Sequence, residues 1–257
     1  VEISINQYTA SIKDNNDYNC TPKKNVVKEP LIKFFKGKLH EFYFGLESDD
    51  KQLICSFELI LFIIKHYNKI HQDLTVDDII NDLIEEYYNN TNTETLLFFI
   101  KKHIKLKNME PLINKISVKD FIKNQEFKDL LSKFINSPDY YVTYIDLYLL
   151  AKKYDLPIIV ISTSPINIHI KIDTPYIILN KNHNNNNYYF IKLPSQHIRG
   201  LNKKNYKLLY FKKSNIVFDI DNDLDTEIQI NIKSELSDYK DYIAISLETY
   251  NNKKNKK

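Results

Sequence analysis

The sequence predicts an α+β fold in which a helical N-terminal half, with a buried central helix, packs on a mostly antiparallel sheet. Residues 53–67 (LICSFELILFIIKHY) are apolar nearly all round, which predicts the buried helix. Residues 138–162 predict a short amphipathic helix that leads into a buried strand. Beyond residue 166 the pattern changes to short β-branched and aromatic runs separated by polar turns, which are typical of strands.

The stretch 138–162 carries the clearest local signals in the chain. Thr143 is suited to cap a helix, and Asp146 stands three residues later, as in a capping box. Apolar residues then recur at helical spacing: Leu147, Leu150, Ala151 and Tyr154. Pro157 cannot continue a helix. The β-branched run 158–161 that follows predicts a strand covered on both faces.

Start signals predict three more helices between these two elements. Thr75 and Ser117 each precede an apolar repeat with an aspartate three residues later, and Thr93 precedes the third. The predicted strands are 166–172, 176–179, 188–193, 206–211, 215–220 and 227–232, with residues 237–247 as a closing strand or helix. The polar run 180–187 (NKNHNNNN) is predicted to be a hairpin tip.

Composition narrows the class of protein. The chain has 257 residues, 43% hydrophobic and 27% charged, which is ordinary for a soluble globular protein, and no apolar run long enough to cross a bilayer. A net charge of +3 is too small to imply a nucleic-acid partner. Two cysteines, Cys20 and Cys55, are too few for a disulfide framework and favour a reducing, cytoplasmic compartment.

The same counts argue against a bound cofactor. Only 3 glycines occur, which argues against a phosphate-binding or dinucleotide-binding loop, and the cysteines and histidines lack zinc-site spacing, so no cofactor or metal is expected. The abundance of Asn, Lys, Ile and Tyr is typical of AT-rich genomes, such as those of some large DNA viruses and protists. A viral protein would act in the host cytoplasm or in the virion.

Cys55 is the single residue that most invites a chemical role. It falls at the first turn of the predicted central helix, where the helix dipole favours the thiolate. The loop before it could supply backbone N–H groups to an oxyanion hole, and a histidine base would have to lie within hydrogen-bond reach. The alternative is that Cys55 is one more small apolar residue of a buried helix, and the residues alone favour this interpretation.

The order of elements resembles an OTU-type cysteine protease, a papain-like deubiquitinase family. An acid-containing loop leads into a nucleophile helix, here DDKQLICSF at residues 49–57, and an aromatic-led helix then runs into a buried strand at 140–162. Two further strands follow, and the likeness covers about residues 45–193. It implies a papain-like fold, ubiquitin as the partner, and hydrolysis of ubiquitin-type isopeptide bonds, with Cys55 as the nucleophile and Asp50 as the acid.

The family pattern also implies a catalytic histidine that opens the last of these strands and precedes an aromatic residue. This chain has Tyr188 there, whose ordinary pKa of about 10 does not suit a base near neutral pH. His183, in the asparagine-rich run, is the nearest histidine, and Gln52 stands three residues before Cys55 with no glycine between. Two hypotheses follow: a diverged hydrolase that uses Cys55, His183 and Asp50, or a catalytically inactive scaffold that binds a protein partner or serves as a viral structural module.

We expect residues 1–46 to form an N-terminal extension, 47–193 the OTU-like core, and 194–257 a β-rich extension of the same domain. The alternating aspartates Asp219, Asp221, Asp223 and Asp225 lack the glycine and distal glutamate of a calcium loop, which favours a solvated turn. Lysines interleaved with Tyr206 and Tyr210 could contact single-stranded nucleic acid, but they are expected by chance in so Lys- and Tyr-rich a chain. The number of subunits is not predicted.

Overall fold

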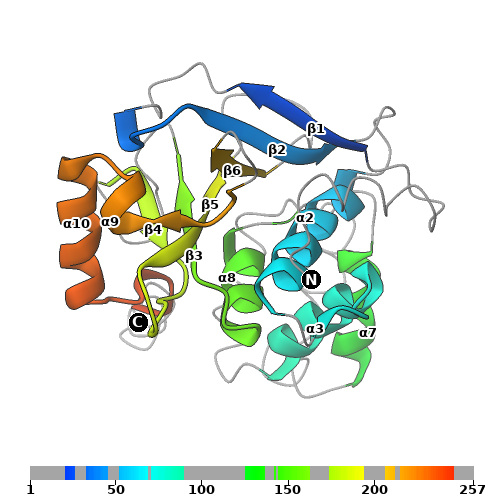
Figure 1. Ribbon diagram of the computed structural model, residues 1–257. Coiled ribbons are helices and arrows are strands. Elements are labelled where there is room, and N and C mark those ends of the chain that lie inside the picture. Colours follow the sequence, from blue (N-terminus) through cyan, green and yellow to red (C-terminus); the bar gives the residue numbers. More distant parts are fainter. Residues whose placement is uncertain are drawn as a thin grey trace.

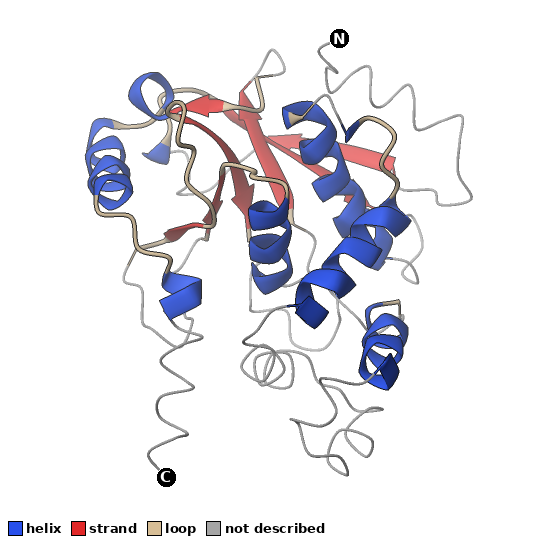
Figure 2. Cartoon of the chain, turned by 90° about the horizontal axis from the view of Figure 1, so that it is seen from below, coloured by secondary structure: helices blue, strands red, loops and turns tan. Residues whose placement is uncertain are grey.

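A computed structural model describes residues 21–26, 33–45, 52–68, 71–89, 125–136, 142, 144–162, 174–193, 206–211 and 215–245. These residues form a seven-stranded sheet with helices on both sides (Figure 1, Figure 2). The strands are β1 (Thr21–Val26), β2 (Leu39–Gly45), β3 (Ile158–Ile161), β4 (Tyr176–Ile178), β5 (Asn187–Lys192), β6 (Lys207–Phe211) and β7 (Phe218–Asp219). Their order is β1-β2-β6-β5-β3-β4, and β7 pairs with β5.

The sheet is mixed, with one parallel pair. β3 and β5 run parallel, with Ile159 opposite Phe190, and every other pair of described strands is antiparallel. Strand β5 is hydrogen-bonded to three neighbours, β3, β6 and β7. The prediction of a mostly antiparallel sheet is therefore confirmed, and strands from both ends of the chain build it.

Helices from different parts of the chain cover the two faces of the sheet. On one side lie α2 (Gln52–Tyr67), α3 (Val76–Asn89), α7 (Gln125–Ile135) and α8 (Tyr144–Lys153), and on the other α9 (Ile220–Asp223) and α10 (Thr226–Ser237) (Figure 1). Side chains of β3 alternate between these faces: Ile158 and Val160 pack in the core with α2 and α8, whereas Ile159 and Ile161 pack with α9 and α10. No helix among the described residues has the length and apolarity to cross a membrane.

The predicted helix-to-strand unit is confirmed as α8 and β3. All four residues of the predicted stripe are buried, but so is every other residue from 145 to 151, because α8 is enclosed rather than laid on a surface. Thr143, the predicted cap, lies outside the described residues, and the structure shows Asp146 in a contact with another helix. Its carboxylate is fully buried and accepts a hydrogen bond from the Tyr87 hydroxyl of α3, which links two helices.

The other helix signals are confirmed where the structure describes them. Thr75 and Asp78 form the predicted capping box at the start of α3: the Asp78 carboxylate accepts from Thr75 N at 2.8 Å, and Asp78 N donates to Thr75 Oγ1 at 3.2 Å. Helix α7 matches the end of the predicted helix after Ser117. The starts at Thr93 and Ser117 and the strand 166–172 lie outside the described residues.

One strand prediction in the C-terminal region is wrong. Residues 227–232 belong to helix α10, because Asp225 caps its start by accepting from Glu227 N, and Ile232 and Leu236, four residues apart, are buried on one face. The predicted strand 206–211 is confirmed as β6, whereas residues 215–220 form a strand only at Phe218–Asp219, which is β7. Strand β7 pairs with β5, and only an isolated bridge joins Phe211 to Asn215.

Candidate functional site

Cys55 lies in the first turn of α2, as predicted for a nucleophile helix. The backbone is helical from Gln52, and the helix is deeply buried from Ser56 onward, with Phe57, Ile63 and Ile64 fully enclosed. The side chain of Cys55 and the whole of Asp50 lie outside the described residues. The geometry of the candidate site therefore depends on where α2 and the segment of His183 lie.

The start of β5 contacts the far end of α2. His66 Nδ1 lies 2.7 Å from the Tyr189 hydroxyl, with the two rings perpendicular at 5.8 Å between centroids. His66 follows Cys55 by eleven residues, which is about 16 Å along a helix that rises ~1.5 Å per residue. The strand start to which the resemblance assigns the catalytic base thus lies against the end of α2 that is remote from Cys55.

Tyr188 occupies the position of the expected catalytic histidine, and it is a structural residue. Its side chain is 1% exposed and points to the face of the sheet that carries α9 and α10. Its hydroxyl accepts a hydrogen bond from Asn182 N at 3.0 Å. Burial raises the pKa of Tyr188 above its ordinary value, so this residue is still less suited to proton transfer near neutral pH.

His183 is exposed in the loop between β4 and β5, and this loop is held to α9. Asn186 O accepts from Ile220 N at 3.0 Å, and Asn186 Nδ2 donates to the Asp221 carboxylate at 2.9 Å. Asn182 strengthens the loop through hydrogen bonds to two other asparagines. The asparagine run, which was predicted only as a polar tip, is an ordered network of side-chain and backbone hydrogen bonds.

His183 and α2 are therefore attached to opposite faces of the sheet. Helix α2 packs on one face, whereas the loop of His183 is bound to α9 on the other. Within the described ranges, no hydrogen bond or ion pair joins His183 to α2.

Two of the four alternating aspartates cap helices. Asp219 accepts from Asp221 N at the start of α9, and Asp225 accepts from Glu227 N at the start of α10. The Asp221 carboxylate accepts from Lys233, Asn186 and Gln229, and these hydrogen bonds, that of Lys233 above all, lower its pKa to about 2. No group of three or more metal-ligating side chains occurs among the residues that the structure describes.

The aromatic residues of the basic segment face inward. Tyr206 and Tyr210 are 5% and 7% exposed, so neither ring is free to stack on a base. Lys207 pairs with Glu41 on β2. The described part of this segment thus contributes to the core and the sheet.

Sequence reasoning missed a buried charge cluster of Glu41, Lys192 and Lys207. Glu41 is 4% exposed, and its two carboxylate oxygens accept from Lys192 of β5, at 2.9 Å, and from Lys207 of β6. Burial alone would raise the pKa of Glu41, but the hydrogen bonds from Lys207 and Lys192 outweigh it and hold the pKa below 4.5. An acidic residue inside the apolar strand LHEFYFG was the only signal in the sequence.

The OTU-like resemblance and the roles of Cys55, His183 and Asp50 stay predictions. The described contacts place the start of β5 against the far end of α2. Cys55, the proposed nucleophile, belongs to α2, and His183, the proposed base, belongs to the loop before β5. Comparisons of this chain with models of known protein families, with curated protein sequences and with solved structures give no match.

Proposed function

We propose that this chain is an OTU-like scaffold that binds a ubiquitin-type protein without cleaving its isopeptide bond. The observation that supports this most strongly is the loop of His183, which is bound to α9 through Asn186 on the face of the sheet opposite α2. A nucleophilic cysteine needs a base within about 3 Å, directly or through one water molecule. The hydrogen bonds from this loop to α9 support a role for the chain in which His183 does not serve as that base.

Tyr188 supports the same conclusion. It fills the position where the resemblance implies a histidine, and its hydroxyl is already bound by Asn182 N. Because burial raises the pKa of Tyr188, the neutral phenol is favoured, and a neutral phenol does not take a proton from a thiol. The buried Tyr188 therefore serves the packing of the fold at the position where a hydrolase of this family would have its catalytic histidine.

The test uses ubiquitin that carries a C-terminal electrophile. We expect no adduct with the full chain, and saturable chemical-shift changes when unlabelled chain is added to isotope-labelled ubiquitin without the electrophile. Cys55→Ala should bind ubiquitin as the unaltered chain does. An adduct that forms with the chain but not with Cys55→Ala would refute the non-catalytic assignment, and the absence of any shift would refute ubiquitin as the partner.

A second candidate function is a hydrolase that depends on Cys55. The position of Cys55 in the first turn of a 16-residue helix favours it, since the helix dipole stabilises a thiolate there. The thiolate would attack the isopeptide carbonyl, the lysine amine would leave with a proton from His183, and water would then hydrolyse the thioester. Under this hypothesis Asn186→Ala, which frees the loop from Asp221, should increase adduct formation, and Cys55→Ala should abolish it.

A further inference from the structure

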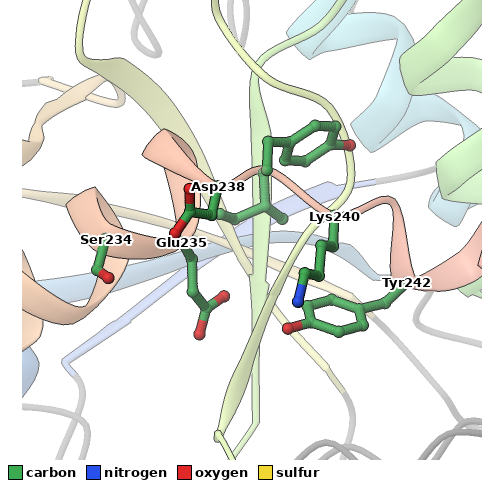
Figure 3. A pocket seen from close by; sticks show the side chains of 7 residues that line it. Ser234, Glu235, Asp238, Lys240 and Tyr242 are labelled. Carbon is green, nitrogen blue, oxygen red and sulfur yellow. The ribbon is translucent and has the colours of Figure 1, made fainter.

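A cavity of about 180 Å³ opens beside the edge strand β4, where the chain leaves α10. Its walls include Ile178 of β4, Glu235 of α10, and Asp238, Lys240 and Tyr242 of the segment that follows. Figure 3 shows Glu235 reaching from α10 on one side and Lys240 and Tyr242 standing on the other. Cavities of roughly 150 Å³ hold a benzene-sized molecule, so this one has room for a short ligand.

Glu235 is the half-buried acidic group of this cavity, and it has no counter-ion among the described residues. Its side chain is half-buried, and it accepts a hydrogen bond of 3.0 Å from the Tyr176 hydroxyl. No lysine, arginine or histidine of the described residues lies within ion-pair distance of its carboxylate. Burial raises the pKa of Glu235, and the Tyr176 hydrogen bond offsets only part of this effect. A cation placed in the cavity would stabilise the ionised carboxylate.

The walls of the cavity also suit a cation by charge and by aromatic surface. Glu235 and Asp238 are acidic and Lys240 is basic, which leaves the lining with one net negative charge. The rings of Tyr239 and Tyr242 form part of the wall. The Tyr239 ring already accommodates an ammonium group, since Lys152 Nζ lies 5.5 Å from its centroid, and tyrosine faces attract such cations.

We propose that this cavity binds a primary alkylammonium group, the chemistry of a lysine side chain or of a small free amine, with Glu235 as its counter-ion. The ammonium would donate to the Glu235 carboxylate, and its alkyl chain would lie against Ile178 and the tyrosine rings. This site is separate from the function proposed above, because its walls include no residue of α2 or of the His183 loop. The two proposals can fail independently.

The test measures binding of n-butylammonium chloride to the full chain by chemical-shift titration at constant ionic strength. The neutral match is 1-butanol, which keeps the alkyl chain and lacks the charge. The variant Glu235→Gln preserves the shape of the side chain and an acceptor for Tyr176. The control Glu227→Gln makes the same substitution at an exposed residue in the first turn of the same helix.

We expect saturable binding of butylammonium to the unaltered chain and to Glu227→Gln, at least tenfold weaker binding to Glu235→Gln, and no saturable binding of 1-butanol. Equal affinity for Glu235→Gln, equal binding of 1-butanol, or no saturable binding to the unaltered chain would each overturn the proposal. Nα-acetyl-lysine methylamide distinguishes the sources. If this compound binds more tightly than butylammonium, the ligand of the cavity is a lysine side chain of a protein. If it binds more weakly, the ligand is a small free amine.

Discussion

Replacing Glu41 with glutamine should destabilise this protein strongly, because Glu41 holds two lysines across three strands. The side chain of Glu41 is 5% exposed, and its carboxylate accepts from Lys192 of β5 and Lys207 of β6. The Lys192 side chain is 13% exposed and the Lys207 side chain 30%. Glutamine keeps the size of the side chain and removes its charge, so the substitution removes the carboxylate to which both lysines donate.

The expected loss of stability is about 3 kcal/mol at neutral pH. Breaking a buried ion pair from one side costs about 3–5 kcal/mol. We place this case at the low end, since the glutamine oxygen still accepts one hydrogen bond and Lys207 can be hydrated. Domains of this kind are stable by only about 5–15 kcal/mol, so the loss is a large fraction of the total.

The loss of stability caused by Glu41→Gln should be larger at pH 7 than at acidic pH. The folded state holds the pKa of Glu41 below the ordinary value of 4.5, so the carboxylate stabilises the fold above that pH. This contribution disappears as the pH falls through the folded pKa. The difference between the unaltered chain and Glu41→Gln should therefore be full at pH 7 and shrink below pH 4.5.

Urea unfolding followed by far-UV circular dichroism measures the effect, since the chain has no tryptophan to report on it. Glu227→Gln, an exposed substitution on α10, serves as the control and should be nearly neutral. Replacing both Glu41 and Lys192 by leucine and methionine should recover part of the loss, because the more buried lysine is removed together with the carboxylate and the Lys207 side chain, 30% exposed, can be hydrated. A loss below about 1 kcal/mol for Glu41→Gln would refute the reasoning.

Ile232→Ala should cost about 2–5 kcal/mol in urea unfolding because Ile232 is fully buried, whereas Ile230→Ala, at a residue 62% exposed, should cost less than about 0.5 kcal/mol. Equal losses would contradict the helical register of α10. Tyr87→Phe removes the hydroxyl that donates to buried Asp146 and should cost about 1.5–3 kcal/mol, and no measurable loss would contradict that role. Glu235→Gln should raise the melting temperature at pH 7, because burial raises the pKa of Glu235 and makes its ionised form the costly one. This gain should vanish below pH 4.5, and a gain independent of pH would contradict it.

The sequence predicted well those elements whose code is local. Thr75 and Asp78 meet within one helical turn, and the run from Ile158 to Ile161 is β-branched throughout, so neither depends on distant partners. Residues 227–232 were predicted wrongly because isoleucines at 228, 230 and 232 satisfy a strand, while Ile228, Ile232 and Leu236 satisfy a helix equally well. Two features decide for the helix: Asp225 caps its start, and the side chain of Ile232 is fully buried.

The candidate site was less predictable because its geometry depends on contacts between distant segments. Cys55 could be assigned to a helix start from local pattern alone. The place of His183 depends on Asn186 meeting Asp221, 35 residues away, and the role of Tyr188 depends on which face of β5 it occupies. Likewise, an acidic residue is unexpected in the apolar strand β2. The role of Glu41 depends on its ion pair with Lys192, which follows 151 residues later in the sequence.

The pairing of β2 with β6 sets the order in which this protein can be assembled during translation. Glu41 and Lys207 are 166 residues apart, and β6 lies between β2 and β5 in the sheet. At a synthesis rate of roughly 5–20 residues per second, the ribosome completes β6 on the order of ten seconds after β2. During that interval the nascent chain presents an unpaired strand edge, to which a chaperone or a neighbouring chain can add. A fragment that stops after β5 would keep this edge open permanently.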